Sequence, residues 1–125
     1  MPGAFSYARA DHPTGVACEE ALGLLDAGHA LLYPSGMGAV TTVVLTLLRP
    51  GGTIALAAGA YYGHRQLLDH LAPWGVNVVE FDQTGAPPDG ADLVFLEAPA
   101  NPTLTMPDFV AAAAHPAPVV CDATV

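Results

Sequence analysis

The sequence predicts an α/β fold in which a mostly parallel sheet is covered by helices on both faces, giving three layers. Two observations predict it. Apolar segments of strand length alternate with segments of helical periodicity, and the strand segments are continuously apolar rather than alternating. Of the 125 residues, 52% are hydrophobic and only 12% are charged. We therefore expect further protein to cover part of this chain.

The first elements are an arm and a helix. Residues 1–13 lack periodicity, and we expect them to form an N-terminal arm ahead of a partial large domain at residues 14–125. Thr14 is expected to cap a helix that stops at Gly28.

A strand should then lead directly into a second helix. Residues 30–33 form a short apolar run ended by Pro34, which predicts a strand. Ser35 is expected to cap a helix that continues to the Arg49-Pro50-Gly51-Gly52 stop.

The pattern then repeats to the end of the chain. Four more strands are expected, at residues 53–58, 76–81, 93–97 and 119–122. A helix around Leu68 should separate the first two, a surface loop at residues 82–92 the next two, and a helix opening at Pro107 the last two. Five strands in all are expected.

Composition excludes several classes of partner. The net charge of −9 argues against a nucleic-acid ligand, because phosphates need a basic patch. The longest apolar run falls short of the ~18 residues that a membrane span needs, so we expect a cytoplasmic protein.

Cys18 and Cys121 lie in apolar contexts and are expected to be reduced core thiols. The five histidines lack metal-ligand spacing, and no metal site is expected.

A phosphate site is one interpretation of the turn before the second helix. Gly36 and Met37 lie where helix amides and the positive end of the helix dipole favour an anion. An ordinary serine cap, with glycines for close packing, explains the same residues equally well.

Other polar residues follow the expected strands, where ligands bind in parallel sheets. Asp122 ends an apolar strand and could either hold a protonated ring nitrogen or cap the next element. Tyr62 could stack on such a ring or simply pack. Asn101 could reach a ligand hydroxyl or start a turn before proline. In the arm, Tyr7 and Arg9 could share a phosphate, although a solvated arm is the simpler interpretation.

Four motifs resemble a known family, the pyridoxal-phosphate enzymes of cysteine and methionine metabolism. Residues 7–14 resemble its Y-S-R-x-x-N-P-T segment, and residues 35–37 resemble its S-S-G-M turn. Residues 93–104 are close to its L-V-F-L-E-T-P-S-N-P-T-L, and residues 119–124 resemble V-V-V-D-N-T. The family includes cystathionine γ-synthase, cystathionine β- and γ-lyase and methionine γ-lyase.

The resemblance implies a truncated type I transferase fold, a pyridoxal 5'-phosphate cofactor and elimination or replacement at Cβ or Cγ of sulfur amino acids. It also implies a homo-oligomer, a dimer of dimers. The implied contacts are Gly36 and Met37 to the phosphate, Tyr62 on the ring, Asn101 by the ring hydroxyl, Asp122 at the ring nitrogen, Thr124 beside it, and Tyr7 and Arg9 to a neighbouring subunit's phosphate.

The chain also departs from the family pattern. His12 stands in place of asparagine, Pro34 replaces a serine, and His64-Arg65 replaces Gly-Thr. No lysine occurs in these 125 residues, so the amine that forms the Schiff base is missing and no catalytic residue is assigned. The sequence also stops before the family's S-x-x-K segment.

We therefore expect the N-terminal part of such an enzyme, inactive alone and prone to aggregate through an open sheet edge. The alternative is a non-catalytic remnant that pairs with a complete paralogue.

Overall fold

The structure is a computed structural model that describes residues 7–8 and 12–124. The chain divides into two compact units, residues 1–39 and 40–125, and each is described by itself. Helix α2, Gly36–Leu47, begins in the first unit and continues into the second. No helix of the described ranges has the length and apolar character needed to cross a bilayer.

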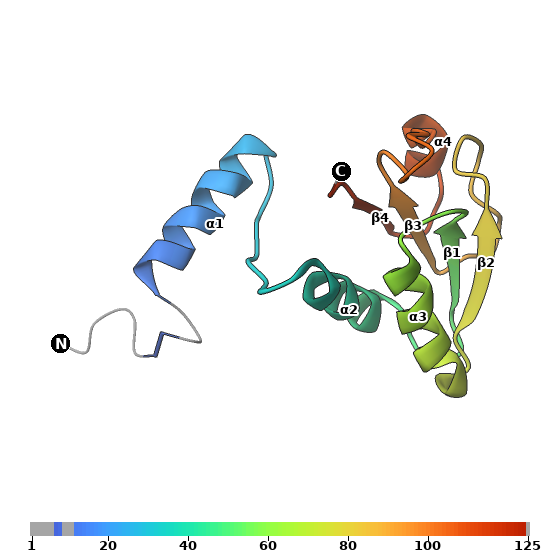
Figure 1. The fold of residues 1–125 in the computed structure, drawn as a ribbon, viewed down its shortest axis with the longest axis horizontal. Coiled ribbons are helices and arrows are strands. Elements are labelled where there is room, and N and C mark those ends of the chain that lie inside the picture. Colours follow the sequence, from blue (N-terminus) through green and yellow to red (C-terminus); the bar gives the residue numbers. More distant parts are fainter. Residues whose placement is uncertain (1–6, 9–11, 125) are drawn as a thin grey trace. The chain divides into compact units, whose positions relative to one another are not determined.

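The second unit is built on a parallel sheet (Figure 1). Among the described residues it has four strands, in the order β2-β1-β3-β4. The strands are β1 Thr53–Ala57, β2 Asn77–Phe81, β3 Leu93–Glu97 and β4 Val119–Asp122. Helix α3, Tyr62–Leu71, with the short helix η1, Ala72–Trp74, connects β1 to β2, and α4, Phe109–Ala113, connects β3 to β4.

Alternate residues of the central strands face opposite layers, which confirms the three-layer prediction. On one face the sheet meets α2 and α3 in a buried cluster of Val44, Leu48, Ile54, Leu56, Leu68, Leu71, Val76, Leu93 and Phe95. On the other face the cluster is smaller and includes α4, with Ala55, Ala91, Val94, Leu96 and Ala112. Both faces of β1 and β3 are therefore buried, which explains their continuously apolar sequences.

The first unit departs from the sequence-based expectations at two points. Helix α1, Pro13–Leu25, is capped by His12 rather than Thr14, because the His12 side chain accepts a hydrogen bond from the Gly15 amide. Residues 29–33 form no strand. Their anchor is instead a hydrogen bond of 2.8 Å from the Leu32 amide to Glu19 Oε1.

Three further expectations need correction. Cys18 and Cys121 are both exposed rather than buried. For Cys121 the reason is that β4 lies at the edge of the sheet, where alternate side chains lack cover. The last helix begins at Phe109, capped by Asp108, and not at Pro107. The sheet of the described chain has four strands rather than five, because residues 30–33 are not part of it.

Candidate functional site

Polar residues of the second unit gather where its strands end. Glu97 and Asp122 are the last residues of β3 and β4 and lie opposite each other in the parallel register. The Ala98 amide donates to the Asp122 carbonyl at 2.8 Å, which fixes the two strand ends side by side. Tyr62, the first residue of α3, follows the end of β1 at the same edge. This edge is where parallel sheets bind ligands.

Glu97 is the buried anchor of this edge, with 4% of its surface exposed. Its Oε2 accepts a hydrogen bond of 2.6 Å from the Tyr61 amide, and its Oε1 accepts one of 3.3 Å from the Asn101 amide. The Gln83 side chain bonds the Glu97 backbone on both sides, donating to its carbonyl at 2.7 Å and accepting from its amide at 3.1 Å. Glu97 therefore ties together the loops that follow β1 and β3.

Asp122 differs because its side chain is 19% exposed. Its Oδ1 accepts from the Thr124 amide at 3.0 Å and from the Thr124 hydroxyl at 2.5 Å. Its Oδ2 lies 3.2 Å from Nε2 of His64. An ionised carboxylate offers about four lone-pair sites. Three are occupied by these contacts, so Asp122 keeps capacity to accept from a ligand.

His64 lies between the two carboxylates and is 2% exposed. Besides the Asp122 contact, its Nδ1 lies 4.0 Å from Glu97 Oε2 and has no hydrogen-bond partner. Burial lowers the pKa of His64, and this effect exceeds the raising effects of Asp122 and Glu97. Burial therefore favours the neutral form of the ring near pH 7.

The remaining predicted site residues of the second unit surround this edge. The Tyr62 ring is 66% exposed, and its centroid lies 4.5 Å from that of Tyr61. A ring so exposed has room to stack on a planar ligand. Asn101 is exposed at the turn after β3, and its backbone is held by Glu97. Tyr62, Asn101, Asp122 and Thr124 thus share one edge of the sheet.

The predicted phosphate contacts begin in the first unit. Gly36 and Met37 open helix α2, and Ser35 Oγ accepts from the Gly38 amide at 3.0 Å, which makes Ser35 the expected cap. A side chain added at Gly36 would meet nothing within 4 Å, so an anion could approach this amide closely. Tyr7 is exposed, and Arg9 lies outside the described residues. Both the phosphate site and the arm's role stay predictions.

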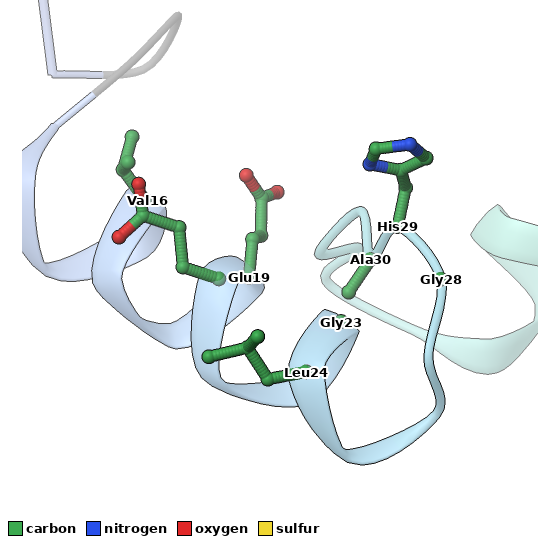
Figure 2. A pocket seen from close by; sticks show the side chains of 8 residues that line it. Val16, Glu19, Gly23, Leu24, Gly28, His29 and Ala30 are labelled. Atoms are coloured by element: carbon green, nitrogen blue, oxygen red, sulfur yellow. The ribbon is translucent and has the colours of Figure 1, made fainter.

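The first unit also contains a shallow pocket (Figure 2). Helix α1 supplies Val16, Glu19 and Leu24, and the segment after it supplies His29 and Ala30. The Glu19 carboxylate of this pocket already accepts a hydrogen bond from the Leu32 amide. In the described part of the chain, no group of three or more histidine, cysteine, aspartate or glutamate side chains is placed to hold a metal ion.

Sequence reasoning did not assign a role to Glu97 or His64. For His64 a signal was present, since it precedes Leu68 and Leu71 at helical spacing and all three form the buried stripe of α3. For Glu97 the signal was an acid ending the apolar run Leu93–Glu97, which is buried throughout.

The residues at the sheet edge fit pyridoxal phosphate. The Asp122 carboxylate can pair with a cationic ring nitrogen, and the exposed Tyr62 ring offers a stacking surface. Fold and edge together define a parallel α/β protein with a candidate ligand site, rich in acidic groups, at the strand ends.

The family model for "Cys/Met metabolism PLP-dependent enzyme" matches residues 1–125. The chain belongs to this family, whose members depend on pyridoxal phosphate, and the predicted resemblance is confirmed.

Individual relatives agree with the family. The chain is 33% identical to a cystathionine gamma-synthase of Mycobacterium bovis, covering 90% of this chain and 31% of the relative. It is also 33% identical to an L-methionine gamma-lyase of Pseudomonas putida, covering 94% and 33%. A crystal structure of metB from Corynebacterium glutamicum superimposes with a TM-score of 0.86 at 30% identity, covering 96% and 34%. The chain therefore spans about a third of these relatives.

Proposed function

We propose that this chain is the pyridoxal-phosphate-binding part of a trans-sulfuration lyase or transferase, which acts at Cβ or Cγ of sulfur amino acids of the cystathionine, homocysteine or methionine class. The family and the names of the relatives support the reaction class. The observation that carries the proposal is the partly exposed Asp122 carboxylate, which has three contacts at its two oxygens and keeps one acceptor site.

Each residue of the site would have one task. Pyridoxal phosphate, when bound, supplies an electron sink through its protonated ring. Asp122 would hold the proton on the ring nitrogen, Tyr62 would cover the ring, and Asn101 would lie by the ring hydroxyl. The amides of Gly36 and Met37 would bind the phosphate, with Thr124 fixing the Asp122 carboxylate. Tyr7 and Arg9 would reach the phosphate of a neighbouring subunit.

Equilibrium dialysis of the chain against pyridoxal phosphate tests this assignment. We expect Asp122→Asn to weaken binding by at least about tenfold, because the lost bond is charge-assisted. Asp89→Asn is the matched control, since Asp89 is exposed in the loop before β3. Equal affinities for the two variants, or no binding by the unmodified chain, would contradict the proposal. Circular dichroism establishes that both variants fold.

We also propose that the 125 residues by themselves do not turn over substrate, and that amino-acid substrates react in the complete protein. The sequence contains no lysine amine to act as acid and base, a role worth ~10²–10⁴-fold in rate. The assay is release of 2-oxo acid from cystathionine or methionine by the chain alone. Enzymatic release above the rate of free pyridoxal phosphate would contradict this statement.

We propose, further, that the chain assembles with copies of itself or with a complete paralogue. Leucines of the first unit support this, since Leu24, Leu25 and Leu31 are 84%, 81% and 73% exposed. Sedimentation velocity over a dilution series tests it. Leu24→Asp should shift the chain toward monomer, while Leu104→Asp, a change at a leucine of the second unit that is 65% exposed, should not. A monomer at every concentration would contradict the proposal.

A further inference from the structure

His64 is the buried group of the site whose role the proposed function leaves open. It belongs to the buried stripe of α3, so the helix directs its ring toward the sheet rather than toward solvent. The ring lies against Phe95, with centroids 4.8 Å apart, and meets the Tyr61 ring edge-on at 5.5 Å. Packing on these sides fixes the ring, because a buried side chain between neighbours has little freedom to rotate.

The fixed ring reaches Asp122 with its outer nitrogen. Nε2 lies 3.2 Å from Asp122 Oδ2, within hydrogen-bond distance, whereas Nδ1 lies 4.0 Å from Glu97 Oε2, beyond it. A neutral imidazole has one N–H, and only Nε2 has an acceptor in range. A proton on Nε2 has the Asp122 carboxylate as its acceptor, whereas a proton on Nδ1 would have no acceptor in range.

This donor completes the restraint on Asp122. Thr124 binds Oδ1 with its amide and hydroxyl, and His64 binds Oδ2. Held at both oxygens, the carboxylate cannot rotate about its terminal bond without losing at least one contact. Its remaining acceptor site therefore has one direction.

We propose that His64 is a positioning residue, which orients the Asp122 carboxylate toward the ring nitrogen of pyridoxal phosphate by donating from Nε2. This inference rests on the proposed function. A neutral donor suits the task, because an imidazolium would compete with the ring nitrogen for the same negative charge.

Paired histidine variants separate positioning from space filling. His64→Leu fills the site without a donor, and His64→Gln keeps an N–H at the end of the side chain. His70→Leu is the matched control, because His70 is exposed in the same helix. The probes are pyridoxal phosphate and its deaza analogue, in which a carbon replaces the ring nitrogen and no bond to Asp122 is possible. Affinities come from equilibrium dialysis.

The ratio of the two affinities is the readout. We expect the unmodified chain and His70→Leu to prefer pyridoxal phosphate over the analogue, His64→Leu to lose about tenfold of that preference, and His64→Gln to restore most of it. If His64 only filled space, His64→Leu would lower the affinity for both probes by the same factor. An unchanged preference in His64→Leu would overturn the inference and leave the proposed function intact. If the unmodified chain binds the two probes equally, both the inference about His64 and the proposed function fail.

Nitrogen NMR of the cofactor-free chain supplies a second readout. We expect the neutral His64 ring to carry its proton on Nε2, and Asp122→Asn to shift the Nε2 signal more than the Nδ1 signal. Glu97, Asp122 and Tyr61 are the titratable groups that face this ring. A proton on Nδ1 in the neutral ring would overturn the inference whatever the dialysis shows.

Discussion

Glu97 and Asp122 end neighbouring strands at paired positions and both lie near the same histidine, but their surroundings differ. Glu97 is buried, and both of its carboxylate oxygens accept hydrogen bonds from backbone amides of the loops after β1 and β3. Asp122 is partly exposed and is held by its own loop and by His64. Central and edge positions in the sheet cause the difference. The Glu97 carboxylate holds the loops of the edge, and the Asp122 carboxylate keeps one acceptor site.

Removing the Glu97 side chain should have the largest effect on stability. Glu97→Ala leaves the amides of Tyr61 and Asn101 without their acceptor in a buried setting, which costs about 3 kcal/mol of unfolding free energy. Urea denaturation followed by circular dichroism measures it. The same change at Glu80, whose pair with Arg65 is half-exposed, should cost less than about 1 kcal/mol. Equal costs would mean that the buried contacts of Glu97 contribute no more to stability than an exposed ion pair does.

Gln83→Leu should have the next largest effect. Leucine is similar in volume to glutamine but cannot form either hydrogen bond to the Glu97 backbone. We therefore expect the free energy of unfolding to fall by about 2 kcal/mol. The same denaturation experiment applies, with Thr84→Val as the exposed neighbouring control. A loss below about 0.5 kcal/mol would show that β3 keeps its geometry without this amide.

The pH dependence of stability should show the burial of His64. Its pKa is lowered in the folded state from the ordinary value of 6.5, mainly by burial, so the unfolded chain binds the proton more readily. The contribution of the neutral His64 ring to the free energy of unfolding is complete above pH 6.5. It is lost as the pH falls through the pKa of His64 in the folded state. On acidification across this range, the denaturation midpoint of the unmodified chain should fall more than that of His64→Leu. Parallel curves would contradict the lowered pKa.

The surface pairs of Arg65 should matter least. Arg65 contacts Asp69 at 2.8 Å and Glu80 at 2.7 Å, but all three side chains are about half-exposed. We expect Arg65→Ala to change stability by less than about 1 kcal/mol, and the change to shrink in 1 M salt. A larger, salt-independent loss would mean that this pair supports the fold as Glu97 does.

Sequence alone predicted the core of the second unit well. Strands β3 and β4 fall where the apolar runs at residues 93–97 and 119–122 placed them, because continuous burial between two helical layers leaves a clear apolar signature. It failed at residues 30–33, which are apolar yet form no strand. A strand is stable only when paired, and pairing is a property of the fold that composition does not encode.

For a related reason, the sequence predicted only part of the grouping of residues at the candidate site. Tyr62, Asn101 and Asp122 follow strands, and parallel strands bring their ends to one edge. His64 and Glu97 lie at this edge through contacts between elements distant in sequence, and such contacts exist only after the sheet has formed. The helical spacing of His64 with Leu68 and Leu71 is typical of a buried stripe, but the sequence analysis did not predict its burial or a partner for it.

Carbonyl carbon NMR of the chain with labelled aspartate and glutamate tests the central distinction most directly. On addition of pyridoxal phosphate we expect the side-chain carboxyl signal of Asp122, assigned through Asp122→Asn, to shift in a saturable way while that of Glu97 stays in place. A shift at Glu97 with none at Asp122, or no shift at either, would contradict the account.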